Sequence, residues 1–253
     1  MDDMLWKRDT WSNPSIPFLF NRNIIEYDIK QAGFSITKEY ELLPASKIQK
    51  LAVMKEMDVK VRLGILQRDD KSFRDALSEG FQTARREFFA QNGLEADNIL
   101  SIKKDAIFTI RECKKEHVGR YIHFRPKHQY SSYMKVGKRK MELYHKSDGT
   151  IDVKGISDEL VAVHEEGMLQ FFRDFIKRME QGDTTNTIRF LRSTIDAYKA
   201  FELPVDYYRE FNAKSEYVTL AGERFDDYWE EEKSNLDISY NYFILCNLAK
   251  ILI

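Results

Sequence analysis

The sequence has only two cysteines, no long apolar run and no internal repeat. Cys113 and Cys246 lie far apart in apolar settings, which predicts two free buried thiols in a reducing compartment. The N-terminus lacks the basic start and apolar core of a signal peptide. The most apolar segment, residues 240–253, is too short to span a membrane and predicts a buried helix. These absences favour a globular, cytoplasmic protein with no membrane partner.

The near-neutral net charge of −1 hides a strong asymmetry along the 253 residues. Residues 101–146 carry 13 Lys and Arg against 4 Asp and Glu, whereas residues 202–237 carry 4 against 11. A basic segment of this kind is typical of a surface that meets nucleic acid, although a solvated basic face has the same composition. The acidic segment leaves open a different class of protein, an α/β interaction protein that docks a basic partner.

Periodicity divides the chain into a mixed part and a helical part. Residues 24–30 read as a strand, residues 69–94 as an amphipathic helix, and residues 98–103 and 106–112 as a hairpin. A second helix is expected within residues 37–66, with Ser46 as its N-cap. Several short strands follow, and from Ser157 the pattern becomes helical. The sequence therefore predicts an α+β fold of 253 residues with two domains, 1–156 and 157–253.

Two isolated acids stand out because each interrupts an apolar, strand-like segment. Asp28 lies in "IIEYDIKQAGFSI" (24–36), and Asp105 lies in "NILSIKKDAIFTI" (98–110). If the two segments meet in space, both carboxylates are available to hold a metal ion. Two other interpretations remain open. In the first, Asp28 is a strand-end acid that caps a following helix. In the second, Asp105 is a turn residue, a position for which Asp is well suited.

The order of these segments resembles that of family B DNA polymerases. "DIKQAGFSI" (28–36) is similar to the family's first palm motif at Asp28, Ser35 and Ile36, and "KKDAIF" (103–108) is similar to the third motif at Asp105. "GKRKMELY" (137–144) and "IDVKGI" (151–156) resemble the segments at the entry to the thumb. The resemblance spans roughly residues 24–180 and leaves no room for an exonuclease domain.

This resemblance implies a polymerase-like palm, an antiparallel sheet flanked by helices, over residues 1–156 and a mostly helical thumb-like part over residues 157–253. It implies a template-dependent nucleotidyltransferase, a DNA polymerase or primase-like enzyme of a phage or mobile element. Two Mg²⁺ ions, or Mn²⁺ in their place, would be held by Asp28 and Asp105. The implied partners are nucleic acid, nucleoside triphosphates and a further replication or polymerase subunit.

The resemblance and the local charge also name candidate binding residues. Candidates for nucleotide binding are Gly33, Lys60, Arg62, Arg68, Lys71 and Arg74. Candidates for nucleic-acid binding are Lys103, Lys104, Lys138, Arg139, Lys140 and Lys154. Aromatic residues interleave with the basic segment and are candidates for base stacking or for the core: Tyr121, Phe124, Tyr130 and Tyr133. Gly33 replaces the family's tyrosine that excludes a ribose 2′-hydroxyl, and Phe34 is expected to point to the opposite face of the strand.

The departures from the family support a second interpretation. Lys103 replaces the first acid of the third motif, and the helix motif that grips the incoming nucleotide is absent. A catalytically degenerate palm, acting as a nucleic-acid-binding or assembly subunit of a replication complex, is the alternative. The histidines at 117, 123 and 128 have no accompanying cysteine or carboxylate pattern, so a zinc site is not expected there.

Overall fold

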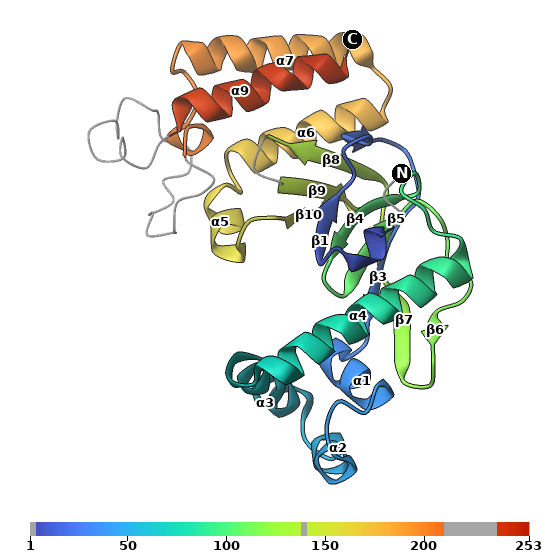
Figure 1. Ribbon diagram of the computed structural model, residues 1–253. Helices are drawn as coiled ribbons and strands as arrows, with labels where there is room; N and C mark the ends of the chain where they lie inside the picture. Colours follow the sequence, from blue (N-terminus) through green and yellow to red (C-terminus); the bar gives the residue numbers. More distant parts are fainter. Residues whose placement is uncertain (1–3, 138–140, 210–236, 253) are drawn as a thin grey trace. The chain divides into compact units, whose positions relative to one another are not determined.

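The computed structural model describes residues 4–137, 141–209 and 237–252 of the chain (Figure 1). It confirms the α+β class. The chain forms two compact units, Met1–Ile16 with Asn23–Gln129 and Pro17–Arg22 with Tyr130–Ile253. The division differs from the expected boundary at residue 156, which falls inside the second unit. The strands at 132–136, 141–145 and 151–154 lie before this boundary, but Met134 and Leu143 share one apolar core with the helices that follow it, which explains the difference.

The first unit is built on a six-stranded sheet with the order β1-β4-β5-β3-β7-β6. The strands are β1 (Thr10–Ser12), β3 (Ile24–Ile29), β4 (Ile99–Lys103), β5 (Ala106–Thr109), β6 (His117–Val118) and β7 (Ile122–Tyr130). The pairs β1–β4, β4–β5, β3–β5 and β6–β7 are antiparallel. The predicted strand at 24–30 and the predicted hairpin around Asp105 are therefore confirmed.

Helices α1 (Ala32–Glu39), α2 (Ala45–Ala52), α3 (Glu56–Asp69) and α4 (Lys71–Asn92) complete this unit, with the short helix η1 (Leu5–Lys7). The first three are grouped at the N-terminal end of α4 (Figure 1). The Asp70 side chain caps α4 by accepting from the Phe73 N–H, and Gly93 ends it at a φ of 59°. The expectation that Ser46 is an N-cap is wrong, because Pro44 is the N-cap residue of α2 and Ser46 lies inside the helix.

Helix α4 packs on one face of the sheet through aromatic rings. The Phe88 ring stacks on Phe124 of β7 at 4.1 Å between centroids and lies 5.6 Å from Tyr27 of β3. Ile25, Tyr27 and Ile29 share this apolar core, since alternate residues of a strand face the same side. The intervening residues of β3, Glu26 and Asp28, therefore belong to the opposite face.

The strand ends at Ile29 and a helix follows, so the strand does not continue to Phe34 as the expectation for its side chain required. Gln31 adopts a left-handed φ of 49° and α1 begins at Ala32, so Gly33 and Phe34 lie in its first turn. The Ser35 hydroxyl donates to the Lys30 carbonyl at 2.7 Å and ties the helix to the end of the strand. The expectation that Phe34 points away from Gly33 across a strand is therefore wrong.

The second unit combines a four-stranded sheet of order β10-β9-β8-β2 with helices. Its strands are β2 (Phe18–Leu19), β8 (Ser132–Val136), β9 (Met141–His145) and β10 (Ile151–Lys154). Its helices are α5 (Asp158–Val163), α6 (Met168–Glu180), α7 (Thr184–Lys199), η2 (Val205–Tyr207), α9 (Ile238–Leu248) and η4 (Ala249–Ile251). Phe171, Phe172 and Phe175 of α6 are buried in one core with β8 and β9. The expected C-terminal helix is present, and Cys113 and Cys246 are free thiols, the first buried and the second partly buried.

Candidate functional site

Asp28 and Asp105 lie at the same end of the first sheet. Asp28, near the end of β3, pairs with Ala106 of β5, the residue directly after Asp105. Asp105 belongs to the two-residue turn between β4 and β5, and its carbonyl accepts from the Ile29 N–H at 3.3 Å. Antiparallel pairing of β3 with β5 thus brings together two acids that are far apart in the sequence.

A cavity of about 530 Å³ opens beside this pair of acids. Basic side chains that line it are Lys60, Lys104, Arg125 and Lys127. Its apolar lining residues, from α1, α3 and α4, are Ala32, Phe34, Val59, Leu63 and Phe81. The cavity therefore combines carboxylates, cations and an apolar surface within one unit, and its volume lies in the range of small-molecule sites.

Lys127 of β7 neutralises part of the negative charge. Its Nζ lies 3.3 Å from Oδ2 of Asp28 and 3.8 Å from Oε1 of Glu26. Burial lowers the pKa of Lys127, but the nearby carboxylates of Asp28, Glu26 and Asp105 outweigh this effect and raise it. Burial, reinforced by the charge of Asp28, raises the pKa of Asp105. The site is thus a compact set of acids around one ammonium group.

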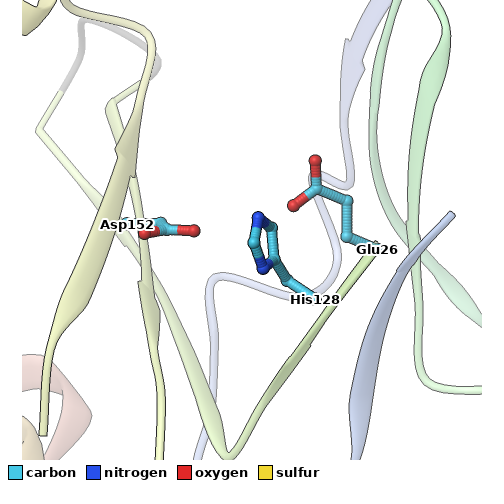
Figure 2. Close-up of side chains that lie close together, drawn as sticks. All are labelled: Glu26, His128 and Asp152. Atoms are coloured by element: carbon cyan, nitrogen blue, oxygen red, sulfur yellow. The ribbon is translucent and has the colours of Figure 1, made fainter. Parts of the chain in front are cut away.

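Glu26 is a third acid on this face that the sequence analysis missed. It is 2% exposed and lies two residues before Asp28 on β3, so both side chains leave the same face of the strand. Its carboxylate approaches the imidazole of His128, also in the first unit, with ligand atoms within 4.8 Å (Figure 2). The signal that we overlooked is the two-residue spacing of Glu26 and Asp28.

The candidates for nucleotide binding divide into two groups. Gly33 and Lys60 line the cavity. A Cβ atom built on Gly33 would meet only the Leu63 side chain, at 3.5 Å, which is ordinary contact. The other four are exposed on α3 and α4 and do not line the cavity: Arg62, Arg68, Lys71 and Arg74. Two of them pair with their own neighbours, Arg68 with Asp69 at 2.7 Å and Arg74 with Asp75 at 3.8 Å.

The candidates for nucleic-acid binding are more scattered. Lys104 lines the cavity, whereas the Lys103 amine donates to the Ser12 hydroxyl at 3.5 Å. Lys154 is on β10 of the second unit. Lys138, Arg139 and Lys140 lie outside the residues that the structure describes, as does most of the acidic segment 202–237.

Most of the aromatic residues of the basic segment belong to the core. Phe124 is buried against Phe88, and Tyr130 and Tyr133 are buried against Tyr144. These three side chains are therefore not free to stack on bases in this conformation. Tyr121 is half-buried, with the Lys38 amine 4.0 Å from its ring centroid.

The three candidate histidines do not converge on one metal site. The His117 and His123 rings stack at 4.2 Å, and His123 Nε2 contacts Glu116 Oε2 at 2.9 Å. The His128 imidazole instead lies near the Glu26 carboxylate, with ligand atoms within 4.8 Å (Figure 2). Asp152, also drawn in Figure 2, is held within the second unit, where it accepts from the Tyr130 hydroxyl at 2.8 Å and the Lys146 amine at 2.7 Å.

The second unit contains a polar cluster around Glu180, at the end of α6. Its Oε1 accepts from the hydroxyls of Ser131 at 2.7 Å and Ser132 at 2.6 Å, and lies 3.0 Å from Nδ1 of His145. Burial raises the pKa of Glu180, but these hydrogen bonds outweigh it and hold the pKa below its ordinary value. Because Ser131 and Glu180 both approach the same nitrogen of His145, the cluster does not form a serine–histidine–acid relay.

The fold and the site define an α+β protein with a cavity that combines acids and bases at one end of an antiparallel sheet. The chain belongs to the family described as Bacteriophage PBS1 gene 130 protein, whose model matches residues 1–253. No curated protein matches the chain. The family makes this a phage protein, in agreement with the expected phage context, and it carries no information on a polymerase palm. Among the described residues, no helix is long and apolar enough to cross a membrane.

Proposed function

We propose that the cavity of the first unit is a nucleotidyltransferase site of a phage protein, DNA polymerase-like or primase-like, in which Asp28 and Asp105 hold two divalent cations. The observation that supports it best is that both acids line one cavity together with four basic side chains. Carboxylate oxygens are the ligands that Mg²⁺ and Mn²⁺ accept, and such ions would activate an attacking hydroxyl and stabilise a leaving pyrophosphate.

The residues of the chain have separate roles in this proposal. Asp28 and Asp105 supply the negative charge that binds the cations. Lys60, Lys104 and Arg125 line the same cavity and would neutralise phosphate oxygens of a nucleoside triphosphate. The side chains of Phe34 and Phe81 form an apolar wall against which a base or sugar would pack.

The alternative is a catalytically degenerate palm that serves as a nucleic-acid-binding or assembly subunit. Lys127 favours it, because its ammonium already lies 3.3 Å from Asp28, where a divalent cation would be expected to bind. A lysine that occupies the metal position balances the charge of the acids but does not activate the attacking hydroxyl as a divalent cation would. Lys103, in place of an acid of the family motif, favours the same alternative.

One experiment separates the two. The purified protein is incubated with a primed template, labelled nucleotides and Mg²⁺ or Mn²⁺, beside Asp28→Asn, Asp105→Asn and the control Asp97→Asn, an exposed acid outside the cavity. The proposal predicts incorporation by the wild type and the control and none by the two cavity variants. Activity that survives in both cavity variants refutes the two-metal site. Template binding without incorporation favours the degenerate palm.

A further inference from the structure

An arginine is buried in the middle of α4. The Arg85 side chain is 0% exposed and its guanidinium donates three hydrogen bonds of 2.8 Å. Nε donates to the Trp6 carbonyl, Nη1 to the Lys104 carbonyl and Nη2 to Oδ1 of Asp9. One side chain thus joins α4, the N-terminal segment and the turn between β4 and β5.

The turn that receives one of these bonds carries two residues of the cavity. Lys104 and Asp105 both line the cavity, and Lys104 adopts a left-handed φ of 55°, which is costly for a residue with a side chain. The Lys104 N–H donates to the Asp9 carbonyl at 2.7 Å, and the Asp105 carbonyl accepts from the Ile29 N–H at 3.3 Å. With the bond from Arg85, the backbone of this turn is held at three points.

Packing alone does not account for an arginine at this position. Burying a guanidinium is unfavourable unless its donors are satisfied, and an apolar side chain would fill the same space without that cost. The planar fork of arginine reaches three acceptors in fixed directions, which a lysine ammonium at the end of a flexible stem does not reproduce. The arrangement therefore favours a role in fixing the geometry of the turn.

We infer that Arg85 is a positioning residue: it holds the Lys104–Asp105 turn so that both side chains are presented to the cavity. This inference rests on the proposed function of the cavity as a metal-dependent site. Arg85 itself does not line the cavity and acts through the turn.

The test compares Arg85→Met and Arg85→Lys with a matched control, Asn92→Ala. Asn92 is also buried on α4 and also ties it to a loop, through bonds from Nδ2 to the carbonyls of Phe88 and Lys115. It does not line the cavity. Full-length proteins are studied at a temperature where all are folded, as checked by circular dichroism. Manganese binding is measured by electron paramagnetic resonance, and exchange of the Lys104 amide by hydrogen–deuterium exchange.

We expect Arg85→Met to bind Mn²⁺ about tenfold to a hundredfold more weakly than the wild type, as is usual when a residue that orients a ligand is lost. Arg85→Lys should be intermediate, and Asn92→Ala should bind as the wild type does. Arg85→Met should also exchange the Lys104 amide faster, while Asn92→Ala leaves it protected. If Arg85→Met fails to fold, Arg85→Lys carries the same comparison.

The experiment distinguishes failure of the positioning role of Arg85 from failure of the proposed metal-dependent function of the cavity. If the wild type binds Mn²⁺ and Arg85→Met binds it equally well, the positioning role is refuted. If the wild type binds no Mn²⁺, the proposed function fails, and amide exchange alone decides the role of Arg85. Faster exchange at Lys104 in the Arg85 variants but not in Asn92→Ala supports it, and equal exchange in all variants overturns it.

Discussion

Removal of the ammonium group of Lys127 is the perturbation that best separates an active metal site from a degenerate one. Lys127→Met keeps most of the side-chain length and deletes the charge that lies 3.3 Å from Asp28 and 3.8 Å from Glu26. Without the ammonium, three carboxylates repel one another at the end of the sheet. The variant should be less stable than the wild type in the absence of metal, and more responsive to divalent cations.

The magnitude follows from the geometry. Two unit charges 3.3 Å apart attract by about 5 kcal/mol at an effective dielectric constant of 20. The Lys127 side chain is 41% exposed, so solvent screening reduces the net contribution to about 1 kcal/mol. A loss of about 1 kcal/mol lowers the melting temperature of a chain of this size by about 2–4 °C.

Thermal unfolding with and without millimolar Mn²⁺ measures both effects. We expect Lys127→Met to melt lower than the wild type without metal and to gain more from Mn²⁺, because the metal stabilises whatever state binds it. Lys115→Met, which removes an exposed lysine outside the cavity, is the control and should match the wild type. A wild type that ignores Mn²⁺ beside a variant that binds it would show that Lys127 replaces the metal. An equal response of both proteins to Mn²⁺ would refute competition at this site.

The basic segment, Gly33 and the Glu180 cluster each give a further prediction. Binding to nucleic acid should weaken steeply as the salt concentration rises. The slope of log affinity against log salt should flatten by about one for each lost phosphate contact when four basic residues are neutralised: Lys138, Arg139, Lys140 and Lys154. A salt-independent affinity in filter binding would contradict this. If the protein polymerises nucleotides, ribonucleotides should be incorporated about as well as deoxyribonucleotides, and Gly33→Tyr should reduce ribonucleotide use; strong discrimination by the wild type would show that another residue selects the sugar. The pKa of Glu180 is lowered in the folded state, so its stabilising effect is present above its ordinary value of 4.5 and is lost as the pH falls through the folded value. Denaturant unfolding should therefore show a larger loss of stability in acid for the wild type than for Glu180→Gln, and parallel curves would contradict the assignment.

The sequence predicts the elements whose signals are local. The apolar spacing, the Asp70 cap and Gly93 predict helix α4. Two apolar segments on either side of Lys104 and Asp105 predict the hairpin of β4 and β5. Asp28 and Asp105 line the same cavity because β3 pairs with β5 immediately beside the turn, and their role as metal ligands stays a prediction. These features depend on short-range pattern and on one strand pairing.

The remainder depends on contacts that no local pattern contains. Gln31 adopts a left-handed conformation just before α1 begins, and a glutamine in the sequence does not predict such a conformation. Lys127 reaches Asp28 only because β7 lies beside β3 in the sheet. The division into units was not apparent either, since β2 lies early in the sequence and pairs with β8. Each of these outcomes is fixed by tertiary packing and not by propensity.

The proposed function requires that Asp28 and Asp105 bind divalent cations in the cavity of the first unit. Titration of the protein with Mn²⁺ in the presence of a nucleoside triphosphate, followed by electron paramagnetic resonance, tests it most directly. We expect two bound Mn²⁺ ions in the wild type and the loss of this binding in Asp28→Asn and in Asp105→Asn, with Asp97→Asn unchanged. An absence of Mn²⁺ binding in the wild type, or binding that both cavity variants retain, would contradict it.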